Sequence, residues 1–337
     1  MQYAFLIKAH ANARYALSME KLALIECQCL LYALDIRAVV TQEKLAGTRF
    51  ILVETEPLDE RGWKLLSCQS GISFTAIREG DWLKPLQLPE AAYLDADLAQ
   101  VLKYKGKTNA DFTLLMLHCA KAASAFALSD APLTVLDPLC GRATTLFCAL
   151  QEGNNAVGIE IDTKAIHEAD TYFGRYLQYH RHKHKRETCS ATLKDGGHAE
   201  EIRYQLAGSA QAFKAGDTRT FRLFHGDTAQ TDQILGRDSC HLIVGDLPYG
   251  VQHAPKGEKG YTTLERLLRE AFPAYRKALV KGGAAAVAFN TYTLKRDAVC
   301  KAMRDAGLTV LTDPPFHDFA HWVEQAVNRD MVIAVKE

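Results

Sequence analysis

The sequence contains no apolar run that approaches the roughly 18 to 20 residues needed to cross a bilayer. Its first residues, MQYAFLIKAH, also lack the basic region and the long apolar stretch that make up a signal peptide. We therefore expect a cytoplasmic protein with no membrane partner.

Closely spaced cysteine pairs are missing as well. None of the nine cysteines forms a Cys-x-x-Cys pair, and several of them, such as Cys119, Cys148 and Cys300, lie inside apolar runs. Scattered, buried thiols are typical of a reducing compartment and not of a disulfide framework or a zinc site. This usage agrees with a cytoplasmic location.

An excess of charge of either sign is also absent. Lysine and arginine together number 40, and so do aspartate and glutamate, so the formal net charge is zero. A protein that coats nucleic acid through overall positive charge is excluded, and any nucleic-acid contact must use a local basic patch.

The chain is long enough for two domains with different secondary-structure patterns. Residues 1–80 predict strands at 3–8, 38–41, 50–54 and 72–77 and helices at 19–34 and 58–66. This βαββαβ order is that of a small α+β, ferredoxin-like domain. Residues 81–110 carry two prolines and a polar stretch, so we expect a linker there.

From residue 111 onward, helices and strands alternate. A helix is expected at 111–127, followed by strands at 133–136, 156–161, 221–224, 241–244, 284–289, 309–311 and 331–335. Alternation of this kind favours an α/β domain over residues 111–337, with a mostly parallel sheet covered on both faces. Ligands bind such sheets at the carboxyl ends of the strands.

Three strands end in turns suited to a nucleoside cofactor. After the first strand, Gly141 permits a tight turn, and the helix start beyond it exposes N–H groups to an anion. A carboxylate at the second strand end can accept ribose hydroxyl protons, and one at the third can accept from an adenine amino group. The candidate cofactor-binding residues are Asp137, Pro138, Cys140, Gly141, Thr144, Thr145, Glu160, Ile161, Asp227 and Thr228.

The fourth strand leads into the segment VGDLPYG at 244–250. It resembles the Asp/Asn-x-Pro-Tyr/Phe motif of methyltransferases that modify amino groups of nucleobases or amides. In that chemistry, the Asp246 carboxylate and the Leu247 carbonyl accept the two amine hydrogens and enrich the nitrogen in electron density. Pro248 holds the turn rigid, and Tyr249 offers a ring on which a base can stack. These four are the candidate catalytic residues.

Together, the glycine turn, the two acids and this loop resemble the class I S-adenosylmethionine-dependent methyltransferases over residues 100–337. The resemblance implies a Rossmann-like domain with a seven-stranded, mostly parallel sheet, and S-adenosyl-L-methionine as cofactor. Asn109 and Phe112 resemble the segment that closes over the methionine end of that cofactor. The alternative is that Asn109 caps a helix and Phe112 belongs to the core.

Within this class, the loop and the N-terminal βαββαβ unit are similar to the THUMP-associated tRNA guanine-N2 methyltransferases. This resemblance implies methyl transfer to guanine N2 in RNA, with tRNA as the expected partner, although residues 1–80 leave little room for a THUMP domain. A DNA amino-methyltransferase and a protein glutamine-amide methyltransferase would use the same loop. The non-enzymatic alternative is an inactive module that binds cofactor and RNA.

An insertion is expected at about 181–218, opening with the basic run RHKHKR at the end of a helix. The run is either a phosphate-binding prong or a set of cations that stabilise the helix C-terminus. His180, His182 and His184 do not converge on one helix face, and no acid or cysteine beside them completes a ligand set, so we expect no metal site.

A second short match to the catalytic motif lies at Asp313-Pro314-Pro315-Phe316. Only one expected strand follows it, whereas three follow the segment at 244–250. We interpret 313–316 as a turn.

Overall fold

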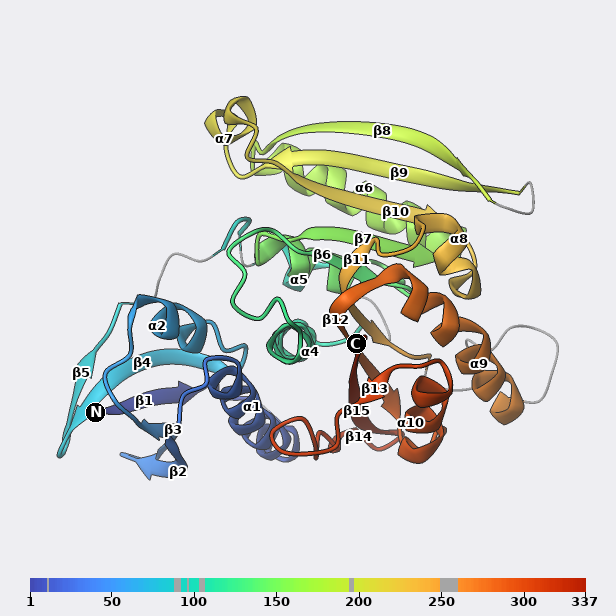
Figure 1. Ribbon diagram of the computed structural model, residues 1–337. Coiled ribbons are helices and arrows are strands. Elements are labelled where there is room, and N and C mark those ends of the chain that lie inside the picture. The colour runs from blue at the N-terminus through green and yellow to red at the C-terminus, as the bar shows by residue number, and fades with distance from the viewer. Residues whose placement is uncertain (11, 88–91, 96, 103–106, 194–196, 249–259) are drawn as a thin grey trace.

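The computed structural model describes residues 1–337 except 11, 88–91, 96, 103–106, 194–196 and 249–259. Figure 1 shows a smaller sheet formed by the N-terminal part of the chain and a larger sheet beside it, with helices between and around them. None of the helices in the described part is both long and apolar enough to span a membrane.

The smaller sheet is antiparallel, with strand order β2-β3-β1-β4-β5. The expected βαββαβ order is present, with a fifth strand after it. Asn12 caps the first helix by accepting hydrogen bonds from the N–H groups of Arg14 and Tyr15, so this helix begins six residues before the expected start. The elements are β1 (Gln2–Ile7), α1 (Ala13–Ala33), β2 (Val39–Leu45), β3 (Thr48–Glu54), α2 (Glu60–Ser67), β4 (Ile72–Glu79) and β5 (Trp82–Pro85).

The segment expected to be a linker is more structured than predicted. β5 extends the smaller sheet beyond residue 80, and a short helix, α3 (Leu98–Val101), lies further on. Leu94 and Leu98 are buried in the main hydrophobic core. Burial of these two apolar side chains anchors the described part of this segment to the core of the larger sheet.

The larger sheet has ten strands over the described residues, where seven were expected, in the order β13-β15-β12-β11-β6-β7-β10-β9-β8 with β14 beside β15. The five strands from β12 to β10 in this order are parallel, and the flanking strands are antiparallel. Strand order reverses between β6 and β11, which opens a ligand-binding crevice at their carboxyl ends in sheets of this kind.

After α3, helices and strands alternate for the most part, apart from the hairpin β8–β9, the pair η1–α8 and the last three strands. They are α4 (Ala110–Ala123), β6 (Thr134–Asp137), α5 (Thr144–Gln151), β7 (Asn155–Glu160), α6 (Thr163–Tyr179), β8 (Lys183–Thr192), β9 (His198–Ala207), α7 (Ala210–Ala215), β10 (Arg219–His225), the 3-10 helix η1 (Thr228–Gln230), α8 (Thr231–Leu235), β11 (Cys240–Asp246), α9 (Gly260–Ala278), β12 (Leu279–Asn290), α10 (Arg296–Asp305), β13 (Thr309–Val310), β14 (His321–Glu324) and β15 (Val327–Val335).

Alternate side chains of the central strands enter two hydrophobic clusters, one on each face of the sheet. Val135 and Leu242 face the side covered by α4, α5 and α6, while Leu136 and Ile243 face the side covered by α8, α9 and α10. Apolar residues of α1 join the first of these clusters. The smaller sheet is therefore connected to the larger one by a continuous core, and not only by the chain.

The insertion at 181–218 forms an antiparallel hairpin, β8–β9, which lengthens the sheet beyond β10 and lies at the upper edge of Figure 1. The expected placement of the basic run at a helix end is wrong for most of it. Helix α6 ends at Tyr179, and Lys183 to Arg186 lie on β8, the outer strand. Lysines on an edge strand oppose pairing with another chain.

Candidate active site

The candidate site lies where β6, β7 and β11 end, next to the reversal in strand order. Asp137 ends β6, Glu160 ends β7 and Asp246 ends β11. Glu160 and Asp246 are both close enough to raise the pKa of Asp137. The absence of a side chain at Gly245 leaves space for the Asp137 carboxyl group, since a Cβ there would lie only 3.3 Å from its Oδ1. The structure therefore brings together three acids that the sequence singled out.

Asp137 is the most deeply buried of these acids. It is 4% exposed, and burial raises its pKa to about 7, against hydrogen bonds from Thr145 and from the Leu139 N–H group that lower it. The distance from the Leu139 nitrogen to Oδ1 is 3.1 Å. A carboxyl group with this pKa gains or loses a proton near neutral pH. Carboxyl groups with shifted pKa values are common at ligand-binding and catalytic sites.

The turn after β6 takes the shape expected from its glycine and an unexpected shape two residues later. Gly141 has φ +51°, and its N–H group donates to Oε2 of Glu160 at 2.8 Å. Ala143 has φ +70°, a left-handed conformation that glycine adopts more easily, yet it is fully buried. Ala143 therefore places a strained backbone at the site.

The other candidate residues around this turn are largely buried. Pro138 and Cys140 are buried, and Thr144 and Thr145 open helix α5 with 7% exposure each. Gly158 on β7 accommodates the turn, since a Cβ there would lie 2.7 Å from Sγ of Cys140. These residues shape and support the turn against β7.

Glu160 and Ile161 present different chemistry at the end of β7. Oε1 of Glu160 accepts hydrogen bonds from the N–H groups of Ile161 and Asp162, both at 2.8 Å, which orients the carboxylate. The Ile161 side chain is 68% exposed. An exposed apolar side chain beside an oriented carboxylate suits a ligand that has both a flat ring and hydroxyl groups.

Asp227 and Thr228 follow β10 and differ in exposure. Asp227 is exposed and caps η1, with Oδ1 accepting from the Ala229 N–H group at 2.9 Å. Thr228 is buried, and its hydroxyl is hydrogen-bonded to the hydroxyl of Tyr275 on α9. Asp227 is thus accessible to a ligand, while Thr228 joins the strand end to the covering helix.

Asp246 has two partners that the sequence did not reveal. Thr108 donates its hydroxyl hydrogen to Oδ2 of Asp246 at 2.7 Å, and Nη2 of Arg329 lies 3.5 Å from the same oxygen. The Asp246 side chain is 16% exposed and that of Arg329 is 5% exposed. The ion pair partly balances a carboxylate that would otherwise be desolvated without a counter-charge.

The rest of the candidate catalytic loop is described in part. The Leu247 N–H group donates to the Ala288 carbonyl at 2.9 Å, and Leu247 is 4% exposed. Pro248 is half-buried, and Tyr249 lies outside the described residues. The first part of the loop is therefore held firmly against β12.

Asn109 caps a helix and Phe112 belongs to the core, which are the two alternative roles given for them above. Asn109 caps α4, accepting from the Asp111 N–H group at 2.8 Å, and its Nδ2 donates to the Tyr15 hydroxyl. Phe112 is fully buried, and the guanidinium carbon of Arg329 lies 4.7 Å from its ring centroid. Phe112 thus supports the arginine that pairs with Asp246.

The second match to the motif is a turn, as interpreted from its position. The Phe316 N–H group donates to the Asp313 carbonyl at 2.9 Å, and Asp313 is exposed whereas Phe316 is 4% exposed. It follows β13 on the far side of β15 from the strand reversal.

No protein-family model matches the chain, and no curated protein matches it either. Among solved structures, it is similar to magnesium protoporphyrin IX methyltransferase from Synechocystis with bound SAH, at 12% identity over 69% of this chain and 90% of that chain, with a TM-score of 0.40. It is also similar to a TehB-like SAM-dependent methyltransferase from Corynebacterium glutamicum, at 14% identity over 67% and 87%, with a TM-score of 0.38.

Proposed function

We propose that this chain is an S-adenosyl-L-methionine-dependent methyltransferase of the Rossmann-like class, which methylates an exocyclic amino group. The observation that carries the proposal is the meeting of Asp137, Glu160 and Asp246 at the strand reversal of a sheet with five central parallel strands. Two of these acids would serve the cofactor, and the third, on the neighbouring β11, would serve the substrate.

The residues present fit this cofactor. A carboxylate offers about four acceptor positions, and Glu160 uses three for the N–H groups of Gly141, Ile161 and Asp162, which leaves capacity for a ribose hydroxyl. The exposed Ile161 would pack against the adenine ring, and the exposed Asp227 would accept from its amino group. Asp137, with its pKa near 7, would meet the charged methionine end of the cofactor.

When bound, S-adenosyl-L-methionine supplies a methyl group already activated for transfer. Asp246 and the Leu247 carbonyl would accept the two amine hydrogens of the substrate and raise the electron density on nitrogen. Transfer of that methyl group would leave the substrate nitrogen with one proton in excess, and Asp246 would accept it. Thr108 and Arg329 would orient the carboxylate through Oδ2. Pro248 would hold the turn rigid, and Tyr249, which lies outside the described residues, would offer the ring on which the base stacks.

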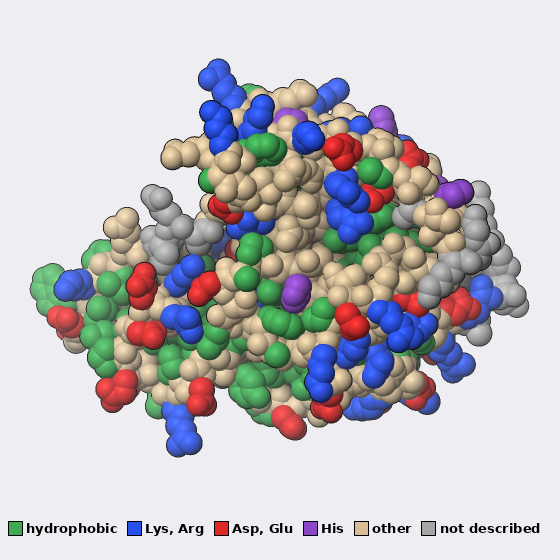
Figure 2. Space-filling model, turned by 45° about the horizontal axis from the view of Figure 1, so that its top comes forward, with side chains coloured by type: hydrophobic (Ala, Val, Ile, Leu, Met, Phe, Trp, Pro, Cys, Tyr) green, Lys and Arg blue, Asp and Glu red, His purple; other side chains and the backbone are tan. Residues whose placement is uncertain are grey.

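We propose guanine N2 in RNA, with tRNA as the partner, as the substrate. The strand order β2-β3-β1-β4 supports a ferredoxin-like assignment for the N-terminal unit, as in the THUMP-associated guanine-N2 methyltransferases. On the face drawn in Figure 2, lysine and arginine side chains lie among acidic ones. RNA would therefore be held through local contacts, such as Lys183 and Lys185 on the exposed edge of β8.

The experiment is incubation of the full chain with radiolabelled S-adenosylmethionine and, separately, total tRNA, ribosomal RNA, DNA and protein, followed by nucleoside or amino-acid analysis. Label in N2-methylguanosine of RNA is the expected result. Label in DNA or in glutamine would overturn the RNA substrate but keep the methyltransferase. Binding of the cofactor without any transfer would favour the inactive module.

A further inference from the structure

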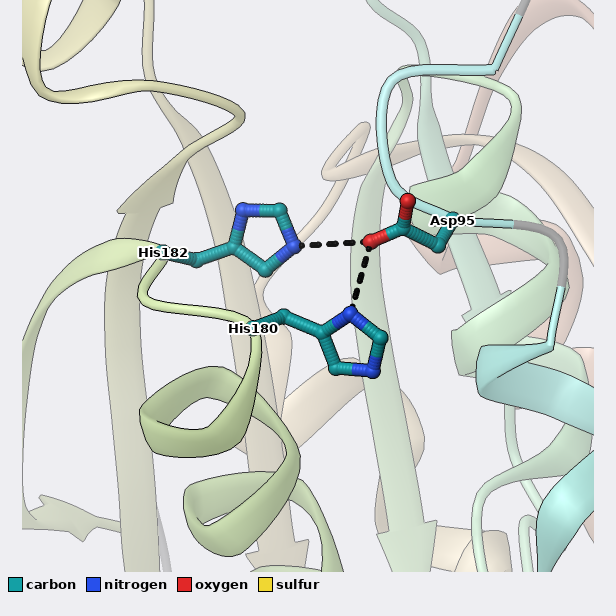
Figure 3. Close-up of side chains that lie close together, drawn as sticks. All are labelled: Asp95, His180 and His182. Atoms are coloured by element: carbon teal, nitrogen blue, oxygen red, sulfur yellow. Dashed lines mark hydrogen bonds and ion pairs between the residues drawn. The ribbon is translucent and has the colours of Figure 1, made fainter.

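Three side chains from two distant segments converge beside the β8–β9 hairpin. Figure 3 shows that His180 and His182, at the connection from α6 to β8, both point toward Asp95 in the segment before α3. Oδ2 of Asp95 lies 3.1 Å from Nδ1 of His180 and 3.2 Å from Nε2 of His182. The three ligand atoms all lie within 4.8 Å of one another. Asp95 is the acid that the histidine pattern lacked in the sequence.

The second nitrogen of each ring also faces an oxygen. Nδ1 of His182 lies 3.2 Å from the Gly208 carbonyl oxygen, and Nε2 of His180 lies 3.8 Å from Oδ2 of Asp97. A neutral imidazole carries one N–H group and one lone pair. With Nδ1 of His182 donating to the Gly208 carbonyl, the Nε2 lone pair of that ring is directed at Oδ2 of Asp95, an arrangement that a bound cation satisfies.

The rings of His180 and His182 are nearly parallel, at 11°, with centroids 5.9 Å apart, and one nitrogen of each ring faces the same oxygen of Asp95. A zinc ion bound to nitrogen and carboxylate oxygen at about 2.0 to 2.2 Å separates neighbouring tetrahedral ligands by roughly 3.3 Å. The observed separations of 3.1 and 3.2 Å match that spacing.

We propose that Asp95, His180 and His182 bind a divalent metal ion of the zinc class. The Gly208 carbonyl and Asp97 act as outer partners that fix the ring orientations, as such groups do in metal sites. The Asp95 side chain is 55% exposed, whereas those of His180 and His182 are 22% and 10% exposed, so the fourth position opens toward solvent. The ion would fasten the segment before α3 to the start of the hairpin, and it does not depend on the proposed methyl transfer.

The test is a titration of the full, tag-free, chelator-treated chain with cobalt(II), followed by displacement with zinc. One equivalent of cobalt is expected, with the visible absorption of a tetrahedral site that zinc abolishes. His182→Gln and Asp95→Asn should weaken zinc binding by about tenfold or more, and Asp97→Asn by about tenfold. His167→Gln, which removes an exposed histidine from α6, is the matched control and should leave the affinity unchanged.

A measurement on the unaltered chain covers the case in which a variant fails to fold. In nitrogen-detected NMR spectra of the histidine rings, zinc should shift Nδ1 of His180 and Nε2 of His182 and leave the outer nitrogens protonated. Absence of saturable binding would overturn the proposal. So would equal weakening by His167→Gln, or spectra in which both rings are doubly protonated at neutral pH and unchanged by zinc.

Discussion

Glu26 of α1 and His118 of α4 form a buried ion pair, with 2.6 Å between Oε1 and Nδ1. The Glu26 carboxylate also accepts from the N–H group and the hydroxyl of Ser70, while Nε2 of His118 lies 3.5 Å from Oε2 of Glu152. Burial lowers the pKa of His118, but hydrogen bonds to Glu152 and Glu26 raise it to about 10. The network joins the two sheets through charged groups inside the core.

Replacement of His118 should destabilise the chain strongly. His118→Leu leaves the Glu26 carboxylate buried without its counter-charge, and breaking a buried pair in this way costs about 3 to 5 kcal/mol. Urea unfolding, followed by circular dichroism, measures the loss. Lys301→Ala removes an exposed pair with Asp305 and is the control, with an expected change below about 0.5 kcal/mol. A similar effect for both variants would contradict the prediction.

The same pair predicts a dependence on alkaline pH. Because folding raises the pKa of His118 from 6.5 to about 10, the stabilisation is complete below pH 6.5 and disappears as the pH rises through 10. Melting temperatures across this range should fall more for the wild type than for the double variant Glu26→Gln/His118→Gln. Parallel curves for the two proteins would show that the pair does not carry the charge inferred here.

Ionisation of Asp137 should lower the free energy of unfolding, over a lower pH range than the one that concerns His118. Its pKa rises from 3.8 to about 7 on folding, so the stability that the protonated group contributes is complete below pH 3.8 and is lost as the pH rises to 7. Asp137→Asn keeps an acceptor for the Leu139 N–H group and should stabilise the chain by on the order of 4 kcal/mol at pH 8, with little effect at pH 4. Unfolding midpoints at the two values test this. Equal effects at both would point to packing instead of ionisation.

Substitutions around Asp246 should separate chemistry from cofactor binding. If the proposed function holds, Asp246→Ala lowers kcat by at least about a hundredfold while cofactor affinity, measured by calorimetry, stays within a factor of about three. Thr108→Val removes the donor to Oδ2 and should lower kcat by about tenfold with KM nearly unchanged. Thr293→Val, at a threonine that hydrogen-bonds the Asn290 carbonyl, is the control for loss of a hydroxyl. Equal loss of binding and turnover in Asp246→Ala would indicate a structural role for this acid.

The positions of the central strands along the chain followed from sequence because parallel strands are short apolar runs that end at acids or glycine. Each of the seven expected runs overlaps a strand. The hairpin β8–β9 was missed because the first of its strands, KHKRETCSAT, is polar and lacks a buried apolar run. An edge strand of this kind is stabilised by backbone hydrogen bonds to the neighbouring strand. Such bonds leave no pattern in the order of apolar residues along the sequence.

The acids of the candidate site were accessible to sequence reasoning because each is the last residue of a strand. Their partners were not. Thr108 and Asp246 are 138 residues apart, and Arg329 reaches Asp246 from the last strand, so only the fold brings them together. Asp95 was missed for the same reason: the histidine spacing was judged along one helix, whereas the acid arrives from another segment.

The packing of α1 against α4 has a mechanical consequence. Because α1 packs into the core of the larger sheet, that packing sets the distance from the smaller sheet to Asp246 before any substrate arrives. A large substrate that contacts both the smaller sheet and Asp246 must match this fixed distance. The reactive group of a substrate with the wrong length would not reach Asp246.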